Sequence, residues 1–338
     1  MKIAMLAPIA WRTPPRHYGP WELVTSLLTE ALVARGVDVT LFATQDSVTA
    51  GRLDGVVPAS YNEDPSVDAK VWEFRHLAHV FEQADRFDLI HNQADFPAHA
   101  FANLTTTPIV TTIHGFSSER ILPMYEPYQH RVNYVAISDA DRHPALRYAA
   151  TIHHGIPVDA FPFDAQGSED LLFFGRIHPD KGPVEAIAAA RTSGRALHMY
   201  GVIQDEGFHA REVKPQVDGN RIQYHGVVGG GERLAALGGA RAMLHLINFD
   251  EPFGLSVIEA MACGTPVIAI NRGSMPELIE HGVNGYLVDS IEQAVEAVGR
   301  AGDLDRAAIR RTVVERFSVD RMADAYLALY ARILGHAA

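Results

Sequence analysis

Short apolar runs alternate with stretches of helical periodicity along the chain. This alternation is typical of parallel sheets built from β-α-β units. In the first half we expect strands at Ile3–Pro8, Val37–Ala43, Leu89–His91, Ile109–His114 and Tyr134–Ser138, and helices at Trp21–Arg35, Val71–Ala84 and Asp141–Arg147. The rhythm then restarts, with strands expected at Leu171–Gly175, Ala196–Gly201, Ile222–Tyr224, Ala242–Leu246, Val267–Ile270 and Gly285–Val288.

The length of the chain and one irregular stretch indicate two domains. A chain of 338 residues is too long for a single ordinary core. The stretch His153–Asp159 is punctuated by glycine and proline and is interpreted as a linker. We therefore expect an α/β fold of two facing Rossmann-like domains with parallel sheets, residues 1–155 and 156–318. The last helix, about Val319–Leu334, is expected to cross back onto the first domain, so that 319–338 belongs with it.

Charge and cysteine content narrow the partners. The 29 Lys and Arg residues against 41 Asp and Glu give a net charge of −12, which disfavours nucleic acid or anionic lipid as the main partner. Cys263 is the single cysteine, so no intramolecular disulfide forms and a reducing, cytoplasmic location is expected. The apolar amino terminus is interpreted as a buried strand rather than a signal peptide. Nothing in the sequence indicates membrane binding.

The most specific motif runs from Glu251 to Glu259 and continues as Ala-Met-Ala-Cys-Gly-Thr-Pro-Val-Ile-Ala. It follows a predicted strand and opens a helix at about Leu255–Cys263. A helix start preceded by Gly254 presents free N–H groups and a positive dipole end, which suits a phosphate. Glu259 shares the apolar stripe of this helix, so its carboxylate needs donors such as ribose hydroxyls or an arginine. A buried structural ion pair is the alternative for Glu259.

A second motif, Phe173-Phe-Gly-Arg-Ile-His-Pro-Asp-Lys-Gly-Pro183, follows another predicted strand. Pro183 suits the first position of a helix. Arg176 and Lys181 would flank that helix start, where two cations and free amides can neutralise a diphosphate. Two solvated surface cations are the alternative.

Two weaker signals lie in the first half. His114 directly follows a predicted strand, where it could hydrogen-bond a sugar hydroxyl or a leaving-group oxygen, although a structural histidine is the alternative. Gly19, in Tyr18-Gly-Pro-Trp-Glu22, follows the first predicted strand and would let backbone approach a ligand.

Together these motifs resemble glycosyltransferase family 4, the retaining enzymes of the GT-B fold, over essentially the whole chain. The resemblance implies a donor cleft between the two domains, with residues 156–318 holding the nucleotide sugar and 1–155 the acceptor. Glu251 would contact the donor sugar and Glu259 the ribose. Arg176 and Lys181 would hold the diphosphate.

The remaining implied contacts are largely made by the backbone. Amides at Phe253, Gly254 and Leu255 would join the diphosphate contacts, and Gly19 would approach it from the first domain. His114 would lie beside the transferred sugar, and backbone near Val227 would meet the base. Family members usually carry two glycines where this chain has Gly19-Pro20, and Pro20 has no N–H to donate.

We expect no metal and no other cofactor. Asp139-Ala-Asp141 matches the D-x-D pattern of metal-dependent glycosyltransferases, but it precedes a predicted helix and is interpreted as an N-cap. The pairs His153/His154 and His76/His79 lack a further ligand at zinc spacing.

The expected reaction is transfer of a hexosyl group from a UDP- or GDP-sugar to a hydroxyl of a small-molecule or saccharide acceptor, with retained configuration implied by the family. Three alternatives stay open: a nucleotide-sugar epimerase of the same fold, an inactive sugar-nucleotide-binding protein, and a dinucleotide oxidoreductase. The last would need a G-x-G-x-x-G fingerprint after the first strand, which the sequence lacks.

Overall fold

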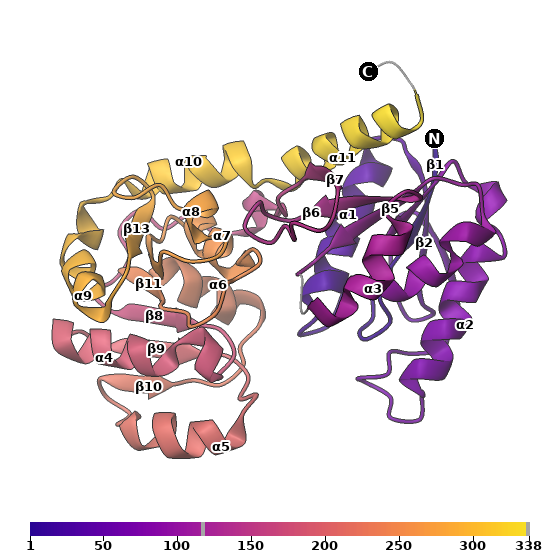
Figure 1. Ribbon diagram of the computed structural model, residues 1–338. Coiled ribbons are helices and arrows are strands. Elements are labelled where there is room, and N and C mark those ends of the chain that lie inside the picture. Colours follow the sequence, from indigo (N-terminus) through magenta and orange to yellow (C-terminus); the bar gives the residue numbers. More distant parts are fainter. Residues whose placement is uncertain (116–118, 336–338) are drawn as a thin grey trace. The chain divides into compact units, whose positions relative to one another are not determined.

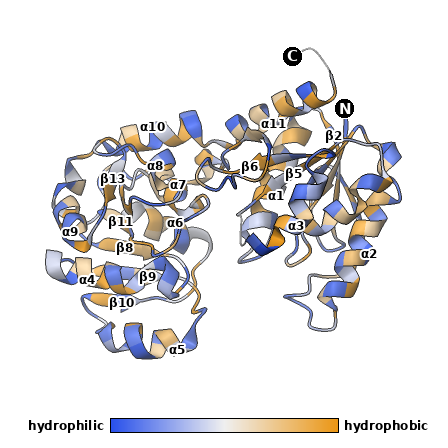
Figure 2. Cartoon of the chain, viewed as in Figure 1, coloured by the Kyte–Doolittle hydropathy of each residue, from blue (hydrophilic) through white to orange (hydrophobic). Residues whose placement is uncertain are grey.

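The computed structural model describes residues 1–115 and 119–335, which form two compact units (Figure 1). Unit 1 comprises Met1–Ile156 together with Val319–Ala338, and unit 2 comprises Pro157–Ser318. In both units apolar residues gather on the central strands of the sheet, and many polar residues lie on the outer helices and loops (Figure 2). Among the helices of the described residues, none is both long enough and apolar enough to cross a membrane.

Unit 1 is built on a seven-stranded sheet in the order β3-β2-β1-β4-β5-β6-β7, and every pairing is parallel. The strands are β1 (Lys2–Leu6), β2 (Asp38–Thr44), β3 (Arg52–Val57), β4 (Leu89–Asn92), β5 (Ile109–Ile113), β6 (Val132–Ala136) and β7 (Tyr148–Thr151). Its α-helices are α1 (Pro20–Ala34), α2 (Ala69–Phe81), α3 (Leu122–Tyr125) and α11 (Val319–Ile333). The chain leaves β1 toward one edge and returns at β4 toward the other, so the strand order reverses between them.

Helix α11 closes unit 1 although it is the last element of the chain (Figure 1). It packs against α1, where Arg35 pairs with Asp320 at 2.7 Å and Asp324 at 3.1 Å. On its buried face, the hydroxyl of Tyr326 lies 2.7 Å from Thr112 Oγ1, and that of Tyr330 lies 2.6 Å from His91 Nδ1. Helix α11 is therefore bound both to helix α1 and to the central strands β4 and β5 of the sheet.

Unit 2 contains a six-stranded parallel sheet in the order β10-β9-β8-β11-β12-β13. The strands are β8 (Leu171–Phe174), β9 (Leu197–Tyr200), β10 (Ile222–Tyr224), β11 (Ala242–His245), β12 (Val267–Ile270) and β13 (Gly285–Val288). Its helices are α4 (Pro183–Ser193), α5 (Glu206–Phe208), α6 (Gly230–Gly239), α7 (Leu255–Ala262), α8 (Met275–Leu278), α9 (Ile291–Arg300) and α10 (Arg306–Arg316). Here the strand order reverses between β8 and β11.

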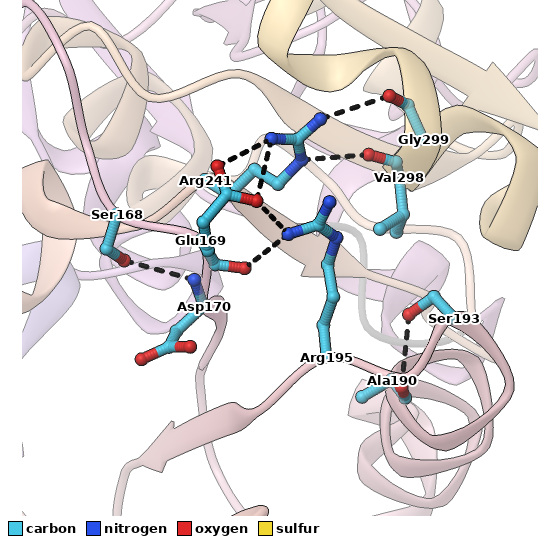
Figure 3. Close-up of polar contacts among 9 residues, drawn as sticks. All are labelled: Ser168, Glu169, Asp170, Ala190, Ser193, Arg195, Arg241, Val298 and Gly299. Atoms are coloured by element: carbon cyan, nitrogen blue, oxygen red, sulfur yellow. Dashed lines mark hydrogen bonds and ion pairs between the residues drawn. The ribbon is translucent and has the colours of Figure 1, made fainter.

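An ionic network lies at the amino ends of the unit 2 strands (Figure 3). Glu169, just before β8, pairs with Arg195 and, at 3.2 Å, with Arg241. Arg241 also donates to the carbonyl oxygens of Val298 and Gly299. These ion pairs and hydrogen bonds connect the amino ends of the strands and so stabilise the sheet. They lie at the opposite end of the sheet from the loops that follow the strands.

The expected α/β fold with two parallel sheets is confirmed, with two kinds of exception. Strands β3 and β7 were not expected, because both are edge strands that are only partly buried and lack a continuous apolar run. The helix expected at Asp141–Arg147 is wrong: the segment forms turns, and Pro144 disfavours helical geometry in the residue before it. The proposed N-cap at Asp139 and Asp141 is therefore also wrong. Asp139 instead accepts a hydrogen bond from Thr151 Oγ1 at 2.6 Å.

Candidate functional site

In unit 2 the candidate residues gather on the loops that leave β8 and β11. These are the two central strands at which the strand order reverses, and loops at such a point diverge and leave a crevice that typically binds ligands. The loop after β8 carries Arg176 and Lys181, and the loop after β11 carries Glu251 and leads into α7. Sequence-distant motifs thus meet at one edge of the sheet.

The two loops are fixed to each other by backbone contacts. Gly182 has a φ of 67°, and a Cβ at this position would lie 1.8 Å from the carbonyl oxygen of Leu246. Asn248 N donates to Asp180 O at 2.7 Å, and its side-chain amide donates to Pro179 O at 3.0 Å. Only glycine permits this close approach, so the sequence Lys-Gly-Pro holds Lys181 against the loop that carries Glu251.

Lys181 and Glu251 form a direct ion pair. The Lys181 ammonium also lies 4.6 Å from the centre of the Phe249 ring, a cation–π contact. His245 Nε2, at the end of β11, lies 3.4 Å from the Glu251 carboxylate. Burial opposes ionisation of Glu251, but the His245 imidazole and the Lys181 charge outweigh it and hold its pKa at about 2. Glu251 is therefore a carboxylate at neutral pH and accepts hydrogen bonds rather than donating them.

Glu259 is buried on α7, and its partner is Arg233 of α6. The Arg233 guanidinium lies 5.5 Å from the centre of the Phe174 ring. Burial raises the pKa of Glu259, and the charge of Arg233 opposes this increase. The ion pair named above as the alternative for Glu259 is thus present in the protein. Arg233 was not named from the sequence.

The start of α7 is the place where the sequence predicts an anion site. Gly254 precedes the helix with a φ of 98°, and it has no side chain with which to cap the first turn. Phe253 is buried, and its carbonyl oxygen accepts a hydrogen bond from Ser274 Oγ at 2.7 Å. Leu255 is the first residue of the helix. The first-turn amides at this end carry the positive end of the helix dipole.

Arg176 and Val227 make other contacts. The Arg176 guanidinium donates to Gln204 Oε1, beside the short bridge between Ile177 and Ile203. Val227 follows β10, the edge strand, and the residue is 66% exposed. Neither is in contact with the Lys181–Glu251 pair among the interactions found in the described residues.

Gly19 and His114 belong to unit 1, where a cavity of about 450 Å³ lies at the reversal between β1 and β4. The cavity is lined by residues after β1, at the start of α1, after β3, on α2 and after β4, including Trp11, Trp21, Glu22, Tyr61, Glu73, His76 and Asp95. Asp95 has a φ of 63°, which is strained for a residue with a side chain, and its carboxylate accepts from the Tyr125 hydroxyl.

His114 is a buried member of a side-chain network. Its Nε2 lies 2.6 Å from Gln93 Oε1, and its ring stacks on Trp21 with centroids 5.2 Å apart. Burial, with the nearby His91, lowers the pKa of His114 to about 3, so the ring is neutral. Gln93 Nε2 is also 3.1 Å from His91, which Tyr330 of α11 contacts. Since Gln93 Oε1 can only accept, His114 carries its proton on Nε2.

Gly19 ends the loop that frames the cavity. It lies directly before α1, and a Cβ there would meet Trp11 Cδ1 at 3.1 Å and Glu22 Oε2 at 3.0 Å. A side chain would therefore displace two of the residues that line the cavity.

Among residues 1–115 and 119–335, no group of three or more His, Cys, Asp or Glu is arranged to hold a metal ion. Asp139 and Asp141 are not part of such a group.

The fold class is that of the GT-B glycosyltransferases. Residues 22–159 match the family model "Glycosyltransferase Family 4", and residues 160–305 match "Glycosyl transferases group 1". The chain belongs to the glycosyltransferases of this family 4 type.

Curated relatives and solved structures agree with this assignment. D-inositol 3-phosphate glycosyltransferase of Mycobacterium leprae is 30% identical over 221 residues, covering 57% of this chain and 46% of the relative. The enzyme of that name from Streptomyces griseus is 31% identical over 231 residues, covering 56% and 47%. The match thus spans about half the length of these curated relatives.

Solved structures share the fold over the whole chain. AviGT4, a glycosyltransferase involved in avilamycin A biosynthesis, aligns with a TM-score of 0.74 at 23% identity, covering 100% of this chain and 99% of that one. Sucrose-phosphate synthase from Thermosynechococcus elongatus aligns at 0.78 and 19%, covering 99% of each. Anabaena HepE, solved in complex with UDP-glucose, aligns at 0.72 and 18%, covering 99% of each. At these identities the likeness concerns the fold.

Proposed function

We propose that this protein is a retaining glycosyltransferase that moves a hexosyl group from a UDP- or GDP-sugar to a hydroxyl of a small-molecule or saccharide acceptor. The observation that carries the proposal is the site at the β8/β11 reversal of unit 2. It combines Arg176 and Lys181 with the uncapped start of α7 on the adjoining loop. Cations and helix-start amides together suit the diphosphate of a nucleotide sugar.

The Lys181–Glu251 pair supports a division of roles between binding and leaving-group stabilisation. A diphosphate offers Lys181 a second anion, which frees oxygen atoms of the ionised Glu251 to accept hydrogen bonds from the donor sugar. Negative charge on the departing diphosphate grows in the transition state, so Arg176 and Lys181 would stabilise that state more than the bound substrate.

The other donor contacts are assigned to groups that can pair with ribose and base. The Glu259 carboxylate would accept hydrogen bonds from the ribose hydroxyls while Arg233 balances its charge. Backbone near the exposed residue Val227 would contact the base. In unit 1, His114 would lie beside the transferred sugar, and the cavity at the β1/β4 reversal would hold the acceptor.

The reaction is proposed to need no metal ion, because Arg176 and Lys181 supply the positive charge that a divalent ion would otherwise supply. The test is release of nucleoside diphosphate from a panel of UDP-, GDP- and ADP-sugars in excess EDTA, with and without a mixture of sugar and polyol acceptors. We expect release from one donor, dependent on acceptor and unchanged by EDTA. Loss of release that Mn²⁺ or Mg²⁺ restores would contradict metal independence. Conversion of the donor sugar without acceptor would instead indicate an epimerase.

A further inference from the structure

The cavity of unit 1 has large aromatic walls. Trp11, Tyr18, Trp21 and Tyr61 all line it, and Trp11 and Tyr18 meet edge to face with centroids 6.4 Å apart. Aromatic faces carry partial negative charge and pack well against C–H groups, so they suit the apolar face of a ring compound. A cavity of about 450 Å³ has room for one such ring with a substituent.

The charged side chains that line this cavity are all acidic: Glu22, Glu73 and Asp95. Among the described residues that line it there is no Lys or Arg. The lining histidine, His76, is buried and its Nε2 lies 3.0 Å from Ala7 O; burial lowers its pKa to about 4, so it adds no positive charge.

Two of these acidic side chains are hydrogen-bonded to other residues of the cavity lining. Glu22 is buried and accepts a hydrogen bond from Trp11 N at 3.1 Å. Burial raises the pKa of Glu22 to about 7, and burial likewise raises the pKa of Glu73, whose carboxylate is hydrogen-bonded to Tyr61. A cavity built for an anion would contain cations, and cations would lower these pKa values. Above pH 7, where Glu22 is ionised, the cavity therefore has hydrogen-bond acceptors for hydroxyls and repels a phosphate.

We propose that this cavity takes an uncharged, hydroxyl-bearing ring as acceptor and excludes a phosphorylated one. This inference rests on the proposed function, which makes the cavity the acceptor site. The proposed acceptor class differs from the phosphorylated compound, D-inositol 3-phosphate, after which the curated relatives are named. The carboxylates of Glu22 and Glu73 would accept hydrogen bonds from ring hydroxyls while the aromatic walls cover the apolar face.

Binding can be measured without turnover, through the fluorescence of Trp11 and Trp21. Matched pairs are titrated at pH 8, above the pKa of Glu22: phenyl β-D-glucoside against its 6-phosphate, and myo-inositol against its monophosphate. We expect at least one uncharged member to bind and its phosphate to bind at least tenfold more weakly, since like charges in a partly buried site repel. A phosphate that binds as tightly as its uncharged partner would overturn the proposal, and so would the absence of binding by every uncharged member at 10 mM.

Two pairs of variants locate the effect. Glu73→Gln should reduce the ratio of affinities for uncharged and phosphorylated ligands severalfold. Glu82→Gln, at the C-cap of α2 and outside the cavity, should leave this ratio unchanged. Tyr18→Leu should weaken binding of the uncharged ligand a few-fold, whereas Phe74→Leu should not. Both aromatic side chains are about half exposed, at 49% and 54%, so neither change should prevent folding. Equal effects within each pair would overturn the proposal.

Nucleoside diphosphate release, measured in parallel, separates the two failures. If nucleoside diphosphate is released but the uncharged ligands do not bind, or the phosphates bind more tightly, the proposed acceptor class is refuted. The transferase proposal then stands. Selective binding of uncharged rings without release from any nucleotide sugar refutes the transferase proposal and retains the ligand class of the cavity.

Discussion

Glu259 and Arg233 show how one buried contact can serve both structure and binding. Each side chain satisfies the other in the protein as described, and Arg233 remains 27% exposed, so the pair is open to solvent from the arginine side. A ribose that donates hydrogen bonds to Glu259 could bind without separating the pair. The ion pair and the ribose role are therefore compatible, and mutation of each partner distinguishes them.

Glu259→Gln should lower both stability and nucleotide affinity. Loss of the charge-assisted contacts is expected to cost about 1–3 kcal/mol of nucleoside diphosphate binding. Arg233→Gln is the matched variant, since it also breaks the ion pair but leaves the carboxylate in place. Calorimetric titration and melting without ligand should show a lower melting temperature in both variants and the larger affinity loss in Glu259→Gln. Wild-type affinity in a Glu259→Gln protein that melts early would remove the ribose assignment.

Glu22 makes the stability of unit 1 depend on pH. Its pKa is about 7 in the folded chain against an ordinary 4.5, because burial disfavours the carboxylate. The folded state therefore holds this proton more tightly than the unfolded state, and stability falls as pH rises from 4.5 to 7. Above pH 7 the loss is constant, at roughly 3 kcal/mol.

Glu22→Gln should remove this loss while keeping a side chain of the same size. We expect the variant to melt several degrees above wild type at pH 8 and close to wild type at pH 4.5. Buried histidines such as His91 also have a lowered pKa and change stability in the same pH range. Their contribution is the same in both proteins, so it cancels when the two melting temperatures are compared. A difference in melting temperature that does not change with pH would show that Glu22 is not protonated by burial.

At the scale of elements, the loop after β8 depends on its close backbone contact with the loop after β11. Gly182→Ala would place a Cβ against Leu246 O and should separate Lys181 from Glu251, with a marked loss of nucleotide affinity. Gly194→Ala is the control, because Gly194 also has a positive φ, of 72°, but a Cβ there meets nothing within 4 Å. The control should cost only about 1 kcal/mol of stability. Equal effects on nucleotide affinity in the two variants would contradict the account.

The elements that could be predicted from the sequence are those with a local signal. Central strands such as β1 and β8 contain continuous apolar runs, and Pro183 and Gly254 mark the starts of α4 and α7. Strand β3, by contrast, is a partly buried edge strand whose apolar residues are interrupted by Asp54 and Gly55. Its sequence therefore shows no regular alternation of apolar and polar residues that would predict its pairing with β2.

The same distinction holds for the site. Residues within one motif, such as Glu251 and Glu259, could be named from their spacing. Arg233 could not, because it lies 26 residues from Glu259 on a different helix, and Gln93 lies 21 residues from His114. Partners brought together by packing leave no local signal, although the need of a buried Glu259 for a donor did indicate that one exists.

At the scale of the whole molecule, each unit has its own site at the reversal of its own strand order. The site of unit 2 combines cations and a helix start, whereas the cavity of unit 1 combines aromatic walls and carboxylates. The contrast in charge supports the two ligand classes that we propose: an anionic nucleotide sugar for unit 2 and an uncharged acceptor for unit 1.

The central claim is that unit 2 binds the diphosphate of a nucleotide sugar, and calorimetric titration tests it most directly. UDP, GDP and ADP are each compared with their nucleosides, on wild type, on Arg176→Ala and on Arg191→Ala as an exposed control on α4. We predict that one diphosphate binds, that its nucleoside binds at least 100-fold more weakly, and that Arg176→Ala alone loses at least tenfold in affinity. Binding of none of the three, or equal binding of nucleoside and diphosphate, would contradict the account.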